Sequence, residues 1–168
     1  LIPVGRGRTL REVSPYQCEA IHRWLHDQSK NAPFILATTE APHFRRVTLT
    51  RMRAEGIPLA RIRETPVGRG FGIRDGNGIM FISHTGAVYP SGFLPQAAGN
   101  VRTADIVEIY RESELFRSIR ETASFKGRCG RCEFREICGG SRARAYATYG
   151  DCLAEDPACI YRPRRYCG

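Results

Sequence analysis

The stretch Cys129-Gly-Arg-Cys132, followed by Cys138, decides how this chain folds. Six of the seven cysteines lie from position 129 onward, and Cys159 stands on a later segment of the same tail. Three thiols at short, fixed intervals can converge on one metal centre without a large fold behind them, and a fourth can complete the coordination shell. The predicted metal ligands are Cys129, Cys132, Cys138 and Cys159.

The spacing alone leaves three interpretations of this site open. An iron–sulfur cluster takes four thiolates, usually a close group and one distant ligand, whereas structural zinc commonly takes two pairs of cysteines. Only Cys129 and Cys132 form such a pair, and the five residues before Cys138 are an atypical gap for zinc. The spacing therefore favours an iron–sulfur cluster over zinc, and zinc over disulfides.

The other three cysteines have different interpretations. Cys152 and Cys167 are rivals of Cys159 for the fourth ligand position. Cys18 lies on the apolar face of a predicted helix, and free cysteine buries readily, so we expect Cys18 in the core.

The composition narrows the possible partners. The chain has 168 residues and a formal net charge of +9, and all but two of its 26 basic residues are arginines. The arginines are scattered evenly, which indicates solvated surface groups rather than the focal patch of a nucleic-acid-binding protein. We therefore expect no nucleic-acid partner, while an anionic substrate stays open.

The sequence also lacks the signals of membrane or secreted proteins. No stretch approaches the roughly 18 consecutive apolar residues of a membrane helix, so no membrane partner is expected. An odd number of mostly clustered cysteines fits a reducing cytoplasm better than a secreted disulfide scaffold. The first residue is Leu1 rather than Met, so we expect the chain to begin inside a longer protein.

The pattern of the first 39 residues predicts a strand, a helix and a second strand. Residues 2–7 resemble the end of an apolar strand that runs into a glycine loop. Ser14 and Gln17 form a predicted capping box at the start of a helix, and the β-rich residues 34–39 follow it. One such unit cannot cover both faces of its parallel strands, so we expect the remainder upstream.

The middle of the chain reads as a linker, a hairpin and two helices. Residues 45–70 are rich in arginine and glycine without a clean period, which predicts a linker or mobile loop. Residues 79–83 and 87–89 flank Thr85-Gly86, a predicted tight hairpin. Thr103 is the predicted cap of the first helix.

Four blocks, in order along the chain, resemble the auxiliary-cluster region of SPASM domains. These domains are C-terminal extensions of radical S-adenosylmethionine (radical SAM) enzymes that modify peptides or mature cofactors, including haems. The blocks are Thr85-Gly-Ala-Val-Tyr-Pro90 with Gly99-Asn-Val101, Cys129 to Gly140, Arg142-Ala-Arg-Ala-Tyr146, and Asp156-Pro-Ala-Cys159. The resemblance favours iron–sulfur over zinc.

The resemblance implies an α+β fold with three parts. Residues 1–45 would be the strand-helix-strand end of a partial (β/α)6 radical SAM barrel. Residues 46–74 would be a linker. Residues 75–168 would be a SPASM-like domain with a β-hairpin, helices and a cysteine-rich tail that binds the cluster.

The departures from the family pattern imply a reduced, twitch-like domain with one auxiliary 4Fe–4S cluster. Full SPASM domains hold two auxiliary clusters, but Tyr89-Pro-Ser91 and Ser141 or Arg142 stand where ligands of the other would lie. The remaining cluster would serve electron transfer or structural closure. The C-x3-C-x2-C triplet of radical SAM enzymes does not occur in the sequence, so we expect the chain alone to be inactive. S-adenosylmethionine and a second 4Fe–4S cluster would belong to the complete enzyme.

The resemblance also implies partners and further sites. The partners would be an N-terminal radical SAM barrel in cis or trans, an electron donor or acceptor protein, and a peptide or small-molecule substrate. Residues expected to face S-adenosylmethionine are Gly5, Arg6 and Gly7. Polar residues after a barrel strand often touch substrate, and here they are Glu40, His43 and Arg45.

Two alternatives complete the predictions. Arg142 and Arg144 would either donate hydrogen bonds to cluster sulfides and raise the reduction potential of the cluster, or lie at the surface. The competing function is a stand-alone interaction module that an iron–sulfur cluster or zinc holds together and that has no catalytic activity.

Overall fold

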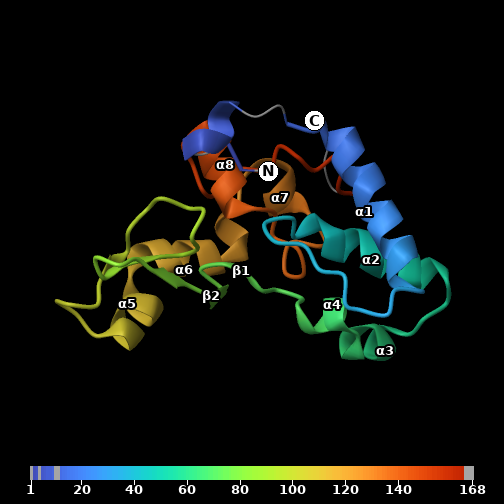
Figure 1. Ribbon diagram of the computed structural model, residues 1–168, viewed down its shortest axis with the longest axis horizontal. Helices are drawn as coiled ribbons and strands as arrows, with labels where there is room; N and C mark the ends of the chain where they lie inside the picture. The colour runs from blue at the N-terminus through green and yellow to red at the C-terminus, as the bar shows by residue number, and fades with distance from the viewer. Residues whose placement is uncertain (1, 4, 10–11, 165–168) are drawn as a thin grey trace.

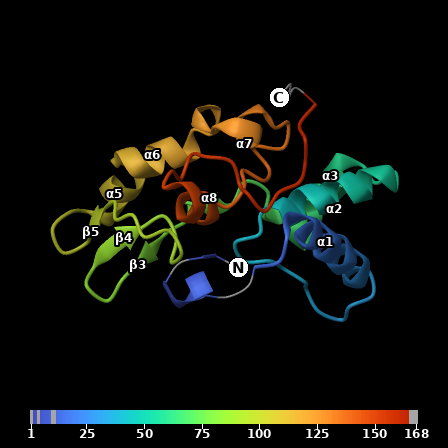
Figure 2. The ribbon, with the colours of Figure 1, turned by 90° about the horizontal axis from the view of Figure 1, so that it is seen from above.

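The computed structural model describes residues 2–3, 5–9 and 12–164. Residues 15–69 gather at one end of the molecule, and the small sheets with two helices gather at the other end (Figure 1). The cysteine-rich tail lies between the two ends, as the view from above also shows (Figure 2). The mixture of helix and strand agrees with the expected α+β class. Among the described helices, none is long and apolar enough to cross a membrane.

Helix α1 (Pro15–Ser29) begins at the predicted capping box. The Ser14 hydroxyl accepts the Gln17 amide hydrogen at 3.2 Å, and the Gln17 side chain accepts the Ser14 amide hydrogen at 2.8 Å. The predicted apolar face, however, is not the buried one. Trp24 is 59% exposed and Cys18 is only half-buried, because α1 packs through charged and histidine side chains. Its buried residues are Glu19, His22 and His26.

The two predicted N-terminal strands are wrong within the described residues. Residues Gly5–Thr9 form the 3₁₀ helix η1, and residues 34–39 have no regular structure. A β-strand needs a neighbour to satisfy its backbone groups, and neither segment pairs with another described strand.

The segment predicted to be an irregular linker is instead helical. It contains α2 (His43–Ala54), α3 (Leu59–Glu64) and α4 (Pro66–Arg69). Helix α2 packs against α1 and buries Phe44, Val47 and Leu49. Because α2 also buries His43 and Arg46, its inner face carries no clean apolar period, and the sequence pattern concealed it.

The predicted hairpin is confirmed and belongs to a three-stranded antiparallel sheet. Strands β3 (Phe81–Ile82) and β4 (Ala87–Tyr89) pair with Ile82 opposite Val88, and the unpredicted β5 (Gly99–Asn100) joins β4. A second, parallel pair consists of β1 (Arg74–Asp75) and β2 (Gly78–Ile79).

Helices cover these strands and connect them to the tail. Helices α5 (Ile106–Glu112) and α6 (Glu114–Arg120) contribute Ile109 and Phe116 to a core that includes Val88. After η2 (Thr122–Ser124), the tail forms α7 (Gly127–Arg131) and α8 (Arg142–Tyr149). Ala143 of α8 packs with Ile119 of α6, so the tail shares a core with the sheet region.

The cap of α5 is Asp105 and not the predicted Thr103. The Asp105 carboxylate accepts the amide hydrogens of Val107 and Glu108 at 2.8 and 3.1 Å. The Thr103 hydroxyl donates instead to the Asn100 carbonyl at 3.2 Å. A carboxylate satisfies two orphan helix donors and interacts favourably with the helix dipole, which explains the preference.

We predict that Asp105→Ala lowers the free energy of unfolding by about 1 kcal/mol, because two amide hydrogens at the start of α5 lose their acceptor. Denaturant unfolding of the purified protein measures this change. Thr103→Ala is the matched control and should cost clearly less. A larger loss for Thr103→Ala would contradict the assignment of the cap.

Candidate metal centre

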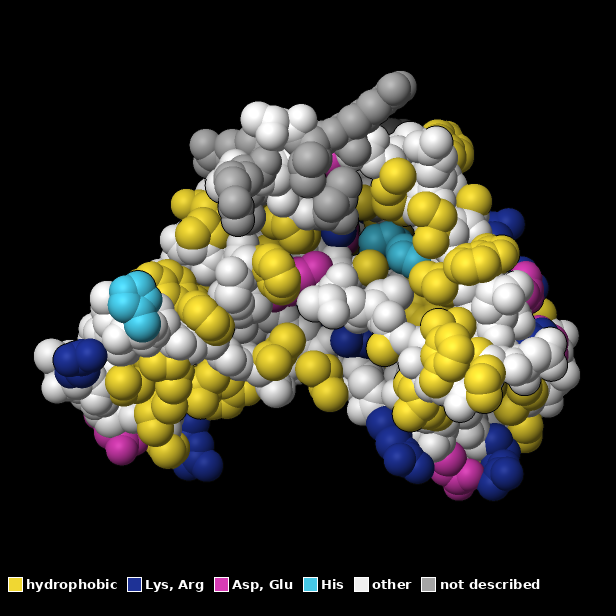
Figure 3. All heavy atoms as spheres, in the orientation of Figure 1, with side chains coloured by type: hydrophobic (Ala, Val, Ile, Leu, Met, Phe, Trp, Pro, Cys, Tyr) yellow, Lys and Arg dark blue, Asp and Glu magenta, His cyan; other side chains and the backbone are white. Residues whose placement is uncertain are grey.

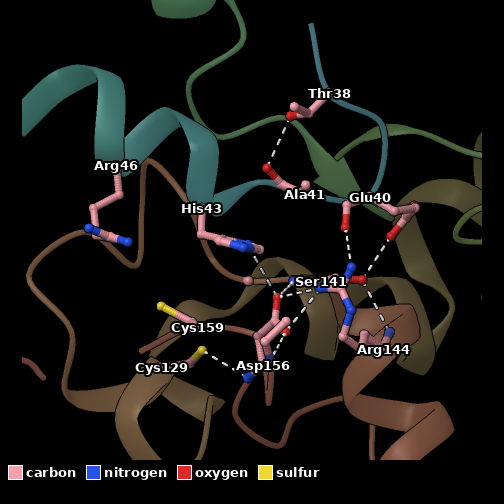
Figure 4. A network of polar contacts seen from close by, with 12 residues as sticks. Thr38, Glu40, Ala41, His43, Arg46, Cys129, Ser141, Arg144, Asp156 and Cys159 are labelled. Carbon is pink, nitrogen blue, oxygen red and sulfur yellow. Dashed lines mark hydrogen bonds and ion pairs between the residues drawn. The ribbon is translucent and has the colours of Figure 1, made fainter. Parts of the chain in front are cut away.

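Four of the predicted ligands border one small cavity. Cys129 lies in α7, Cys132 ends that helix, and Cys138 follows a short turn. Cys159 reaches the same cavity from the C-terminal loop, and Figure 4 shows its side chain beside that of Cys129. Cys152 packs instead in the core with Leu94 and Ile119, whereas Cys167 lies outside the described residues.

In the described part of the chain, no three His, Cys, Asp or Glu side chains stand close enough together to hold a single metal ion. The sulfurs already have hydrogen-bond donors. Cys129 Sγ accepts the Asp156 amide hydrogen at 3.4 Å, and Cys132 Sγ accepts the Phe134 amide hydrogen at 3.4 Å. Such donors stabilise a thiolate and tune a metal centre that it binds.

Burial keeps the thiols of Cys132, Cys138 and Cys159 neutral until a metal displaces their protons. Burial raises the pKa of Cys132 to about 11 and raises the pKa values of Cys138 and Cys159 as well. Metal binding to such a site therefore releases protons and contributes directly to folding.

Two glycines after Cys138 allow the loop to pass close to its neighbours. Gly139 and Gly140 have φ values of +69° and +67°, a conformation that favours glycine. A Cβ atom on Gly140 would lie 3.1 Å from Cys129 Sγ and 2.6 Å from Arg142 Nη2. Any larger residue there would displace a predicted ligand or the arginine beside it.

The Asp156 carboxylate connects three segments behind the cavity (Figure 4). It accepts the Ser141 amide hydrogen at 2.8 Å and two hydrogen bonds from Arg144 at 3.0 Å. His43 Nδ1 of α2 lies 3.7 Å away. Burial by itself would raise the pKa of Asp156, but the charge of Arg144 and these hydrogen bonds hold it below its ordinary value.

Glu40 and Arg45, two of the three residues predicted to contact substrate, border a second cavity. Asp75 and Ser141 also line it, and Gly140 borders both cavities. Glu40 has a φ of +53°, and such strain in a non-glycine residue often marks a functional position. Its carboxyl group accepts the Ser141 hydroxyl hydrogen at 2.8 Å, and its carbonyl accepts from Arg144 at 2.8 Å.

Burial, followed by the negative charge of Asp75, raises the pKa of Glu40 to about 8. The Asp75 carboxylate accepts the Ala143 amide hydrogen at 2.9 Å, but its Oδ1 atom is buried without a partner in the described structure. Glu40 therefore keeps its proton at neutral pH.

The remaining predicted residues lie elsewhere. His43 does not border the second cavity but is buried in a T-shaped contact with His22, with ring centroids 4.3 Å apart, and burial lowers its pKa to about 3. Gly5, Arg6 and Gly7 lie in η1 and not at a strand end. The surface alternative for Arg142 and Arg144 is wrong, since both are buried.

Sequence reasoning missed Arg74 and Asp75, which lie at the boundary between the predicted linker (46–74) and the predicted SPASM-like domain (75–168). It also missed the role of Asp156, although this residue opens one of the family-like blocks. A signal was available in the sequence. Asp156 stands three positions before the predicted ligand Cys159, and arginines that could pair with it lie in the preceding block.

Comparison with known proteins places the chain in a family. No protein-family model matches it. It is 41% identical over 163 residues to the AdoMet-dependent heme synthase of Methanosarcina barkeri, an alignment that covers 97% of this chain and 47% of that protein. It is 40% identical over 88 residues to the PqqA peptide cyclase of Rhodopseudomonas palustris, with 49% and 23% of the two chains covered.

The pre-heme d1 synthase of Dinoroseobacter shibae is 35% identical over 92 residues, which cover 52% of this chain and 23% of that protein. The chain spans about half the length of the curated relatives that match it throughout. Similarity along nearly the whole chain to one group, and along half of it to two others, shows that the chain belongs to the radical SAM/SPASM-type proteins as a C-terminal region.

Proposed function

We propose that this region holds one auxiliary 4Fe–4S cluster in a radical SAM enzyme that matures haem or another cofactor. The observation that carries the proposal is that three cysteines of α7 and the turn after it border one cavity with a fourth cysteine from the C-terminal loop. The similarity to AdoMet-dependent heme synthases extends over nearly the whole chain, whereas the similarity to PqqA peptide cyclase covers half, which favours haem or cofactor over peptide. The proposed ligands are Cys129, Cys132, Cys138 and Cys159.

The bound cluster would supply one-electron transfer chemistry, and its four thiolates leave no iron open to substrate. The chain's own residues would hold it, donate hydrogen bonds to its thiolates and exclude water. Phe134 and Tyr161 border the cavity with their rings 5.3 Å apart and would shield it. An electron donor or acceptor protein would complete the transfer in a reducing cytoplasm.

The second cavity is our proposed place for substrate contact. Glu40 and Arg45 border it with Asp75, and Gly140 separates it from the thiols. A substrate there would lie beside the proposed cluster, which is the arrangement that electron transfer needs. His43 would not touch substrate. It would help to position Asp156, which its Nδ1 atom approaches.

A radical SAM barrel, in cis or trans, is the proposed partner of the end of the molecule that residues 15–69 form. Phe34 and Ile35 are exposed there and border an apolar groove with Met52 and Val67, and hydrophobic side chains gather on this end of the molecule (Figure 3). An exposed apolar patch of this kind indicates an interaction surface. S-adenosylmethionine and the second 4Fe–4S cluster would belong to the barrel, with Gly5, Arg6 and Gly7 near it.

We predict that Cys159→Ala removes most of the iron, acid-labile sulfide and visible absorbance of the anaerobically reconstituted protein, because the cluster loses one of four ligands. Cys152→Ala is the matched control and should keep the cluster, since Cys152 packs in the core away from the cavity. The reverse pattern would refute our fourth ligand. Stoichiometric zinc without sulfide in the wild type would refute the cluster.

We predict that Glu40→Gln flattens the dependence of stability on pH. The pKa of Glu40 rises from 4.5 to about 8 on folding, so the folded state binds more protons between these values. The free energy of unfolding therefore falls as pH rises through this window, and the substitution removes that fall. Denaturant unfolding from pH 5 to about pH 8 measures the slope, with the exposed Glu108→Gln as control. An unchanged slope in Glu40→Gln would contradict the shift.

We predict that this chain alone forms no 5′-deoxyadenosine from S-adenosylmethionine under reducing conditions, because its sequence lacks the cysteine triplet. Chromatography of the reaction mixture measures the product, and a heme synthase relative of full length is the positive control. Reproducible product formation by the chain alone would overturn this part of the proposal.

A further inference from the structure

Arg142, the first residue of α8, is completely buried, with 0% of its surface exposed. Its Nη1 donates to the carbonyls of Cys152 and Ala154 at 3.0 and 2.6 Å, and its Nη2 lies 3.6 Å from Cys129 Sγ. Among the described residues, no carboxylate comes within ion-pair distance of this guanidinium. Besides these two carbonyl oxygens, the group that the guanidinium approaches is the Cys129 sulfur, which would be negatively charged as a metal-bound thiolate.

Three other arginines that are buried or partly buried have carboxylate partners. Arg144 pairs with Asp156 at 3.0 Å, and Arg46 pairs with Glu19. Arg128, which borders the cysteine cavity, pairs with Glu155 at 2.7 Å. A buried charge without a partner costs several kcal/mol, so Arg142 is an exception that needs an anion.

Arg74 is a second exception. It is 5% exposed and donates only to backbone carbonyls, those of Gly72 at 3.0 Å and Arg120 at 3.4 Å, within the described structure. Its guanidinium carbon lies 5.4 Å from the centre of the Phe125 ring, and that of Arg142 lies 4.5 Å from the same ring. Two unpaired cations therefore share one aromatic ring, an arrangement that their mutual repulsion disfavours.

Both guanidinium groups approach the loop that follows Cys138. A Cβ atom on Gly139 would lie 2.6 Å from Arg74 Cδ, and a Cβ atom on Gly140 would lie 2.6 Å from Arg142 Nη2. The two glycines thus leave room for the two arginine side chains, and the glycines themselves border the cavity that the four cysteines line. Arg142 Nη2 lies 3.6 Å from Cys129 Sγ, and the Arg74 side chain passes beside the glycine that follows Cys138.

We propose that Arg74 and Arg142 are a pair of built-in counter-ions for the thiolate-bound cluster and that they raise its reduction potential. This inference rests on the proposed function. A cluster held by four thiolates carries net negative charge, and it gains one more negative charge when it takes up an electron. Two fixed cations in a low-dielectric surrounding stabilise the reduced form more than the oxidised form. The pair thereby favours a cluster that accepts an electron.

Redox titration of the cluster-loaded protein, monitored by electron paramagnetic resonance, tests the inference. We expect Arg142→Gln and Arg74→Gln each to lower the equilibrium constant for one-electron reduction at least tenfold, about 59 mV in midpoint potential. The double variant Arg128→Gln/Glu155→Gln removes a compensated pair beside the same cavity and should shift the potential less.

A second measurement separates counter-ions from ordinary packing residues. If the arginines balance the negative charge of the cluster, each Gln variant should lower the midpoint temperature of unfolding more in the cluster-loaded protein than in the cluster-free protein. Equal losses in both forms would overturn the inference, as would unchanged potentials in Gln variants that keep their cluster. If Arg142→Gln loses the cluster, the midpoint potential and the midpoint temperatures of unfolding of Arg74→Gln decide between the two outcomes. Absence of any cluster from the wild type would refute the proposed function instead.

Discussion

The buried ion pair between Asp156 and Arg144 is the constraint on which the site depends. Asp156 precedes Cys159 by three residues, and its backbone amide also donates to Cys129 Sγ. Its carboxylate holds the first turn of α8 through the Ser141 amide, while Arg144 reaches on to the Glu40 carbonyl. The backbone of Asp156 therefore contacts two of the cysteines, while its carboxylate holds α8 and, through Arg144, one wall of the neighbouring cavity. Removing either partner would leave a buried charge unpaired, which costs more than the pair contributes.

The parts of the fold that follow from local rules were predicted from the sequence. The capping box of Ser14 and Gln17, the hairpin around Thr85-Gly86 and the cysteine spacing each depend on residues a few positions apart. In each case the residue types meet a local requirement for hydrogen bonding, backbone conformation or metal ligation. The approach of Cys159 to the other three cysteines is not local, and the spacing therefore left Cys152 and Cys167 as rivals for the fourth ligand position.

The parts that depend on distant partners were mispredicted or missed. Residues 34–39 have strand-forming side chains, but a strand also needs a neighbour, and no adjacent strand is described. Helix α2 was hidden because its inner face pairs His43 and Arg46 with groups on other segments, so burial did not follow hydrophobicity. Arg74 and Asp75 gave no signal for the same reason, since their roles come from α8 and from the loop after Cys138.

The excess of arginine, interpreted from the sequence as solvated surface, has a structural use in the interior. Four arginines at the centre of the molecule are buried, and they are Arg46, Arg74, Arg142 and Arg144. A lysine buried there would readily lose its proton, whereas arginine keeps its charge and offers a planar fork of donors that can reach several carbonyls at once. Arg142 uses that fork to bind two carbonyls while it still points at a sulfur. A region that must hold a negatively charged centre away from water therefore has reason to prefer arginine, because only a permanent cation can balance that charge in the core.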